Sequence, residues 1–263
     1  MEIIKNDIDG GKGFDWGRTS KDYASFRDIY PDIFYEKIIE MDLCTKGQKV
    51  LDIGTGTGVL PRNLYKYGAE FIGMDISDKQ IEQARSLTAE AGMNISYVVS
   101  PAETANFPDG YFDVVTACQC YAYLDKRTIF SKISSILKAS GHFCILFMAW
   151  LVEESEIAEK SEQLILKYNP SWSAHGIKRF VYDFPDEAKD LFDVDSSFVY
   201  DVPVSFTRES WHGRMKTCRG IGASSLSAKE IAKFEREHIK YLESVPETFT
   251  IPHFVTVFNL RKK

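Results

Sequence analysis

The glycines that follow Asp52 form the part of the sequence best suited to bind a charged small molecule. An apolar run, Val50–Ile53, contains Asp52 and leads directly into Gly54, Gly56 and Gly58. Glycine accepts a left-handed backbone and lets a ligand lie against main-chain N–H groups. Where such a turn ends a strand and opens a helix, these N–H groups bind polar or charged ligands. The run therefore predicts a ligand site, with a glycine turn that binds nothing as the alternative.

The spacing of the three glycines distinguishes two kinds of nucleotide site. A dinucleotide fingerprint requires Gly-x-Gly-x-x-Gly, and here Val59 occupies the position of the third glycine. The observed Asp-x-Gly-x-Gly-x-Gly resembles motif I of the class I S-adenosylmethionine (SAM) dependent methyltransferases. The resemblance implies that Asp52, Gly54, Gly56 and Gly58 contact SAM. A NAD-linked oxidoreductase is the alternative that the spacing disfavours.

A second acidic residue, Asp75, closes the apolar run that begins at Phe71. Ligands of open α/β sheets bind at the carboxyl ends of the strands, where an acid on the second strand accepts hydrogen bonds from both ribose hydroxyls. The alternative is that Asp75 caps the following helix, but Ser77 and Gln80 form a capping box that serves this purpose. The resemblance agrees with a ribose contact, since the family carries an acid here, and it adds Ile76 as a cofactor neighbour.

The loop after Ile95–Val99 is similar to the loop that holds adenine in this family. Many relatives carry Asp-Ala there, whereas this chain has Pro101–Ala102. Glu103 either replaces the missing acid or is a solvated loop residue, and backbone groups near Ala102 are a further means of holding the base. We expect Ala102 and Glu103 to contact the cofactor.

Tyr111–Cys118 is predicted to be the fourth strand, whose end faces both cofactor and acceptor in this family. The resemblance assigns Cys118 and Gln119 to the cofactor and Tyr121 to the wall of the acceptor pocket. Zinc sites take about four ligands, and no cysteine pair elsewhere in the sequence matches Cys118 and Cys120. We therefore expect no metal, and we interpret both cysteines as small apolar wall residues.

The segment before the core carries the pattern Tyr-x-x-x-Arg-x-x-Tyr-Pro, which begins at Tyr23. It resembles the N-terminal lid of many small-molecule methyltransferases. Tyr23 and Arg27 are four residues apart, so they share one helix face. The resemblance offers the cofactor carboxylate as a partner of Arg27, and a surface ion pair with Asp28 is the alternative.

A long segment after the fifth strand, residues 151–195, is expected to cover the acceptor as a cap. Farther along, the Trp-His-Gly-Arg segment at residues 211–214 resembles a segment near the acceptor pocket of relatives. The candidate acceptor-binding residues are Trp172, Trp211 and Arg214, and the candidate general bases are His175 and His212. A structural or solvated histidine is the alternative for both bases.

Both covers are expected to be mobile without ligand, because water must leave the site and mobile covers commonly exclude it. We expect residues 10–30 and 168–182 to gain order when the cofactor binds. An aromatic-rich insertion that forms a dimer interface is the alternative.

Asn169–Trp172 resembles the Asn-Pro-Pro-Tyr/Trp tetrapeptide of methyltransferases that act on amide or adenine nitrogens. In those enzymes the tetrapeptide follows the fourth strand, whereas here it lies beyond the fifth, and its third residue is serine. We therefore interpret it as a turn within the insertion.

The composition disfavours nucleic acid and membrane as partners. The 263 residues carry a net charge of −6 and no long basic run, unlike a chain that binds a phosphate backbone. Five scattered cysteines indicate a reducing compartment, and the first residues lack a signal-peptide pattern, so we expect a cytoplasmic protein. No apolar run reaches the length of a membrane span. The expected partner is a small-molecule acceptor, and the chain is expected to be a monomer or a homodimer.

Alternating strand and helix patterns between Lys49 and Trp150 predict a parallel sheet wound with helices. The expected fold is α/β and Rossmann-like, with seven mostly parallel strands, helices on both faces and an antiparallel last strand. A single domain is predicted over 1–263, with a lid at 1–48, a SAM-binding core at 49–150, a cap at 151–195 and the last two strands with helices at 196–263. Helices are predicted near Val59–Tyr67, Lys79–Ala91, Lys126–Lys138, Glu153–Tyr168 and from Ser227 to Leu242, and later strands over His142–Trp150, Ser197–Phe206 and Thr250–Leu260.

These features make the chain similar to the class I SAM-dependent methyltransferases, in the small-molecule group called type 11. The implied reaction is direct displacement, in which an acceptor atom takes the methyl group and S-adenosylhomocysteine (SAH) leaves. Because the methyl group is already activated by its positive sulfur, the protein supplies mainly proximity and alignment. The alternatives are a SAM-binding protein without catalysis, an RNA or protein methyltransferase, and the NAD-linked oxidoreductase.

Overall fold

The computed structural model describes residues 2–263, which form two compact units. Unit 1 comprises Met1–Ile29, Ala149–Arg179 and Asp201–Phe254. Unit 2 comprises Tyr30–Met148, Phe180–Tyr200 and Val255–Lys263. The single domain expected over residues 1–263 stays a prediction.

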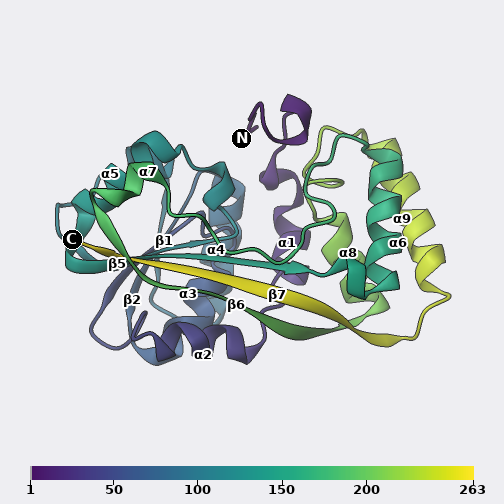
Figure 1. The fold of residues 1–263 in the computed structure, drawn as a ribbon. Coiled ribbons are helices and arrows are strands. Elements are labelled where there is room, and N and C mark those ends of the chain that lie inside the picture. The colour runs from purple at the N-terminus through teal and green to yellow at the C-terminus, as the bar shows by residue number, and fades with distance from the viewer. Residues whose placement is uncertain (1) are drawn as a thin grey trace. The chain divides into compact units, whose positions relative to one another are not determined.

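Seven strands form a sheet in the order β3-β2-β1-β4-β5-β7-β6, with β7 antiparallel (Figure 1). This arrangement confirms the predicted α/β, Rossmann-like fold class. The strands are β1 (Lys49–Ile53), β2 (Glu70–Asp75), β3 (Ser96–Val99), β4 (Phe112–Cys118), β5 (Leu137–Trp150), β6 (Phe192–Thr207) and β7 (Thr248–Lys262). Strands β6 and β7 are longer than predicted.

The central strands of unit 2 are apolar on both faces. Leu51 on β1 pairs with Val115 on β4, and both side chains are fully buried. A parallel sheet that is covered on both faces requires such near-continuous apolar runs. Since β1, β2 and β4 pair in parallel, their carboxyl ends meet at one edge of the sheet. Asp52 and Asp75 lie near this edge, which is where ligands of such sheets bind.

Helix α4 of unit 2 begins at the side-chain cap that the sequence predicts. The Ser77 hydroxyl accepts a hydrogen bond from the backbone N–H of Gln80 at the start of α4, and such caps satisfy otherwise unpaired N–H groups. Helices α3 and α4 pack against β2, and α5 packs against α7. The helices are α2 (Asp32–Glu40), α3 (Val59–Leu64), α4 (Asp78–Glu90), α5 (Lys126–Ile136) and α7 (Asp186–Lys189). The helices predicted near residues 79–91 and 126–138 are confirmed, apart from the last two residues of the second. Over the predicted 59–67, α3 ends at Leu64 and a 3₁₀ turn follows at Tyr65–Tyr67.

Strand β5 begins earlier than predicted. Residues 138–141 were expected to end a helix, but the strand already starts at Leu137, which pairs with Phe112 and is fully buried. The Lys138 ammonium forms an ion pair of 2.7 Å with Asp113, and Ser140 adopts a left-handed φ of 60° at a shift in register. A bulge of this kind continues a strand past residues that otherwise favour a turn.

Unit 1 is built largely from helices (Figure 1). Helix α1 packs against α8, α8 against α9, and α9 against α6. The helices are α1 (Ser20–Phe26), α6 (Glu156–Tyr168), α8 (Arg208–Lys216) and α9 (Ala228–Leu242). Helix α6 begins three residues later than predicted because Ser155 caps it. The helix predicted from Ser227 to Leu242 is confirmed, and a capping box between Ser227 and Glu230 opens it.

Helix α8 has no counterpart among the predicted elements. Thr207 opens it through a capping box with Ser210, a pairing that the usual Ser/Thr-x-x-Glu/Gln pattern does not include. Across residues 2–263, none of the helices has the length and apolar character that crossing a bilayer requires.

Candidate functional site

A glycine turn joins β1 to α3 in unit 2. Gly54 has a φ of 64° and Gly58, which precedes α3, has a φ of 74°, a region that side chains rarely adopt. A Cβ added at Gly54 would stand 2.5 Å from the Cβ of Cys120. The chain therefore needs glycine at position 54 for both its backbone angle and its close approach to Cys120, which lies just beyond β4. The predicted turn is thus confirmed in conformation.

Asp75 ties the end of β2 to this turn. One carboxylate oxygen accepts a hydrogen bond of 2.9 Å from the backbone N–H of Gly56, and the other accepts 2.8 Å from that of Ser77. Burial raises the pKa of Asp75, and the N–H donors of Ser77 and Gly56 oppose this rise. Each carboxylate oxygen has a further lone pair, so the group can also accept from hydroxyls of a ligand. Ile76 follows directly and is half-buried.

Asp52 is buried beneath the turn, with 2% of its surface exposed. Its carboxyl group accepts a hydrogen bond of 2.6 Å from the Thr116 hydroxyl on β4. Burial raises the pKa of Asp52 to about 7, against the lowering effect of the Thr116 and Thr55 hydroxyls. Sequence reasoning missed Thr116, although a lone hydroxyl within the apolar run of β4 is a signal that could have indicated it.

The expected adenine loop contains a short 3₁₀ turn, Ala102–Thr104. The Glu103 carboxylate accepts a hydrogen bond of 2.9 Å from the backbone N–H of Asp125, the residue that caps α5. Glu103 thus has a structural contact within unit 2. Its role at adenine, and that of Ala102, stay proposals.

The side chains of Gln119 and Cys120, just after the end of β4, donate hydrogen bonds to backbone carbonyls of the same unit. Gln119 has a left-handed φ of 64°, and its amide donates 2.6 Å to the carbonyl of Met148. The Cys120 thiol donates to the carbonyl of Ile53 at 3.0 Å. Burial raises the pKa of Cys118 to about 12, so its thiol is protonated and is no nucleophile. No cluster of three or more potential metal-ligating side chains occurs within residues 2–263.

Tyr121 contributes to an aromatic cluster beside these residues. Its ring lies 5.1 Å from that of Tyr182 and 6.3 Å from that of Phe130. Burial raises the pKa of Tyr121 to about 12, so its hydroxyl stays neutral. This geometry suits the predicted wall residue, and contact with an acceptor stays a proposal.

In unit 1, Tyr23 and Arg27 share a face as predicted. The Arg27 guanidinium lies 4.6 Å from the centre of the Tyr23 ring and 5.7 Å from that of Trp16. Among the described residues the buried Nε of Arg27 has no hydrogen-bond partner, and the surface ion pair with Asp28 stays a prediction. A cofactor contact of either residue stays a proposal.

The acceptor-binding candidates of unit 1 are all buried. Trp172 is 2% and Trp211 0% exposed, and the Arg214 guanidinium lies 4.7 Å from the centre of the Trp150 ring. The Trp211 indole N–H donates to the Ser161 hydroxyl at 2.9 Å. These contacts give Trp211 a packing role, and direct contact with an acceptor stays a proposal for all three candidates.

His212 belongs to a buried chain of hydrogen bonds. The Ser161 hydroxyl donates to the carbonyl of Ile157 and accepts from Trp211, so it must also accept from His238 Nε2 at 3.0 Å. His238 Nδ1 then carries no proton and accepts from His212 Nδ1 at 2.9 Å. This assigns the lone pair of His212 to Nε2. Burial lowers the pKa of His212 to about 4 and that of His238 to about 3.

His212 is neutral and has a lone pair on Nε2, but its lowered pKa makes it a weak base and its contact with His238 is structural. His175, the other candidate base, is exposed, and its ring lies 6.2 Å from that of Trp172. Catalytic roles for both stay proposals.

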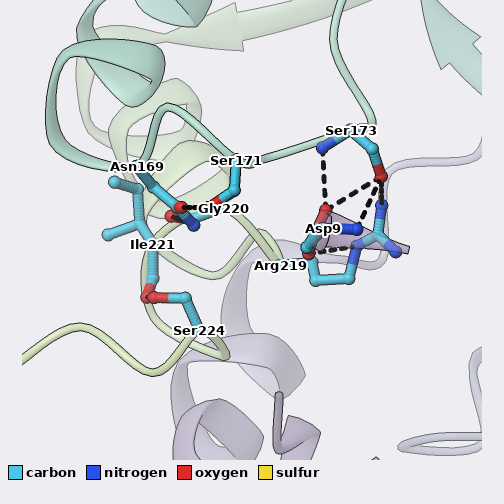
Figure 2. Close-up of polar contacts among 8 residues, drawn as sticks. All are labelled: Asp9, Asn169, Ser171, Ser173, Arg219, Gly220, Ile221 and Ser224. Carbon is cyan, nitrogen blue, oxygen red and sulfur yellow. Dashed lines mark hydrogen bonds and ion pairs between the residues drawn. The ribbon is translucent and has the colours of Figure 1, made fainter. Parts of the chain in front are cut away.

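An ion pair ties the N-terminal segment to the insertion within unit 1 (Figure 2). The Asp9 carboxylate accepts from the backbone N–H and hydroxyl of Ser173 at 2.7 and 2.9 Å. Its other oxygen lies 3.3 Å from Arg219 Nε. Both charged side chains are at most 8% exposed, so the pair holds three distant segments of the chain together.

Asn169–Trp172 forms the predicted turn, closed by the backbone N–H of Trp172 on the carbonyl of Asn169 at 3.1 Å. The Asn169 amide donates to the carbonyl of Gly220 and its oxygen accepts from Ser171, each at 3.0 Å (Figure 2). The interpretation as a turn is confirmed, and the Asn169 side chain forms its hydrogen bonds within the protein.

Comparison with known proteins decides the family. A family model described as a methyltransferase domain matches residues 50–141. Residues 50–141 are a class I SAM-dependent methyltransferase domain. This confirms the resemblance inferred from the glycine spacing, and members of the methyltransferase family use SAM as their methyl donor.

The methyltransferase domain has relatives with named roles. The chain is 28% identical over 137 residues to the ubiquinone biosynthesis O-methyltransferase of Pectobacterium atrosepticum, and 31% identical over 140 residues to that of Erwinia tasmaniensis. Each match covers 51% of this chain and 56% of the relative, so the chain spans about half the length of the curated relatives it matches.

A solved structure is similar in fold over more of the chain. The YcgJ protein from Bacillus subtilis has a TM-score of 0.52 at 19% identity, covering 87% of this chain and 97% of its own. At this identity the likeness shows the fold alone.

Proposed function

We propose that the protein transfers a methyl group from SAM to a small-molecule acceptor by direct displacement. The observation that carries the proposal is the joined glycine turn and Asp75, which place a carboxylate beside backbone without side chains at the edge of the sheet where ligands bind. The family of residues 50–141 supports SAM as the methyl donor. The names of the relatives support a small-molecule acceptor.

The residues of the turn suit the cofactor in shape and charge. Glycine at positions 54 and 58 leaves no side chain between the backbone and a ligand, and Asp75 keeps lone pairs for ribose hydroxyls while it holds the N–H of Gly56. We propose that Asp75 accepts hydrogen bonds from the ribose hydroxyls and that the neighbouring polar part of the cofactor lies against the turn. The expected contacts of Ile76, Ala102, Glu103, Cys118 and Gln119 belong to the same proposal.

The protein's own residues mainly align the reactants. SAM supplies a methyl group on a positively charged sulfur, so an acceptor with an available lone pair needs proximity above all. A general base is needed only where the acceptor must lose a proton early. His142 lies within 3.3 Å of the Asn259 amide oxygen, and His238 and His253 are fully buried. We therefore propose His175 and His212 as the bases.

Calorimetry with three ligands tests the choice of cofactor. We expect SAM and SAH to bind and NAD not to bind, because Val59 replaces the third glycine of a dinucleotide site. NAD binding without SAM binding would overturn the proposal. SAM binding without release of SAH across a broad screen of metabolites would instead identify a binding protein without catalysis.

Replacing Asp75 by alanine tests the ribose contact. We expect the dissociation constant for SAH to rise about tenfold or more, since charge-assisted hydrogen bonds contribute about 1.5–3 kcal/mol each. Far-UV circular dichroism should show an intact fold. Asp78→Ala, an exposed acid in the first turn of α4, is the matched control and should leave the constant unchanged. An unchanged affinity in Asp75→Ala would place the ribose elsewhere.

A further inference from the structure

Tyr97, which no sequence pattern indicated, lies directly beneath the glycine turn. It stands on β3 opposite Gly73 of β2, and a Cβ added at Gly73 would lie 2.7 Å from two carbons of its ring. A Cβ added at Gly58 would overlap the phenol oxygen. The ring therefore crosses β2, and its hydroxyl fills the space that a side chain at position 58 would occupy.

The phenol is held in this place from α4. Its oxygen lies 2.8 Å from the Thr88 hydroxyl, and Tyr97 and Thr88 are 8% and 4% exposed. The Arg85 guanidinium donates to the carbonyl of Tyr97 at 2.9 Å. A buried hydroxyl needs a hydrogen-bond partner. The hydrogen bond between Tyr97 and Thr88 therefore fixes the position of the ring under the turn.

The contact falls at the point where the turn becomes a helix. Gly58 precedes the first residue of α3 with a φ of 74°, and its N–H donates to the carbonyl of Thr55 at 2.9 Å. Asp75 holds the N–H of Gly56 on one side of the turn, and Cys120 lies against Gly54 on another. Tyr97 supplies the support under the remaining glycine.

We propose that Tyr97 and Thr88 are positioning residues, which hold the Gly54–Gly58 turn in the geometry that binds the cofactor without touching it. This inference rests on the proposed function, because it assigns to the two hydroxyls the preorganisation of the SAM site. A turn that is ordered before binding loses less entropy when the ligand arrives. Removing either hydroxyl therefore weakens binding while the fold persists.

The test measures SAH affinity in Tyr97→Phe, Thr88→Val and the double variant. We expect each single variant to raise the dissociation constant about tenfold, the change typical of one lost hydrogen bond. The double variant should match the single ones, since both substitutions break the same contact. Tyr111→Phe, which keeps a ring packed on Phe112 in the same unit, is the control and should bind like wild type.

A second comparison separates positioning from general stability. Gly58→Ala should lose several-fold less affinity in the Tyr97→Phe background than in wild type, because the phenol oxygen that meets the new Cβ is gone. Equal losses in both backgrounds, or a lower melting temperature in Tyr97→Phe with unchanged SAH affinity, would overturn the inference. Failure of the wild-type protein to bind SAH would instead reject the proposed function.

Discussion

Replacing Asp9 by asparagine should lower the free energy of unfolding by about 3 kcal/mol, because it removes one counter-charge from the buried Arg219 guanidinium. The amide oxygen of asparagine can still accept a hydrogen bond from Ser173. Its NH₂ group would face the Arg219 guanidinium, and because both groups are donors, no hydrogen bond forms between them. The backbone of Asp9 has a φ of 50°, a conformation that asparagine tolerates. The substitution thus removes the negative charge at position 9 while the backbone conformation is kept.

Hydrogen exchange and urea unfolding measure this effect. Protection should fall together in the three segments that meet at the pair (Figure 2), around Asp9, Ser173 and Arg219, because local opening exposes segments that share their contacts. Asp7→Asn, an exposed acid two residues away, is the control and should leave protection unchanged. Loss of protection around Asp9 alone would show that the pair does not join the segments.

The ordering of residues 10–30 and 168–182 by ligand stays a prediction, and the same exchange experiment with SAH measures it.

Replacing Asp52 by asparagine should remove a pH dependence from the stability of the ligand-free protein. In the unfolded chain this carboxyl ionises near its ordinary pKa of 3.8, whereas burial raises the folded pKa to about 7. Between these values the folded state holds a proton that the unfolded state has lost, so stability falls as pH rises, by about 1.4 kcal/mol per pH unit. Above pH 7 the loss is complete.

Urea unfolding from pH 4 to pH 8 checks this expectation. The variant should lack the slope, and at pH 8 it should be more stable than wild type, by on the order of 4 kcal/mol. Its affinity for SAH should fall, since binding sites are commonly kept at a cost in stability. Asp109→Asn, at an exposed position of the same unit, serves as control. A slope that persists in Asp52→Asn would assign the titration to another group.

Local patterns in the sequence were enough to predict the strand, the glycine turn and the first helix of the methyltransferase domain. Glycine spacing, capping boxes and apolar periodicity act over a few residues, so α4 and α9 begin at the capped positions that Ser77 and Ser227 predict. The same patterns predicted Asp75 at the end of β2. These features depend on the backbone freedom of single residues and on their neighbours in sequence, so the sequence alone is enough to predict them.

The tertiary structure alone decided which distant side chains meet. Residues far apart in the chain form the contacts of Asp52 with Thr116, Asp9 with Arg219 and His212 with His238. It also decided that β5 starts at Leu137, where pairing with Phe112 overrides a sequence that favours a turn. Burial and strand register arise only once the chain is packed, since buried polar groups must find partners wherever the fold brings them. For this reason the sequence indicated the glycine turn, whereas only the structure placed Tyr97 against it.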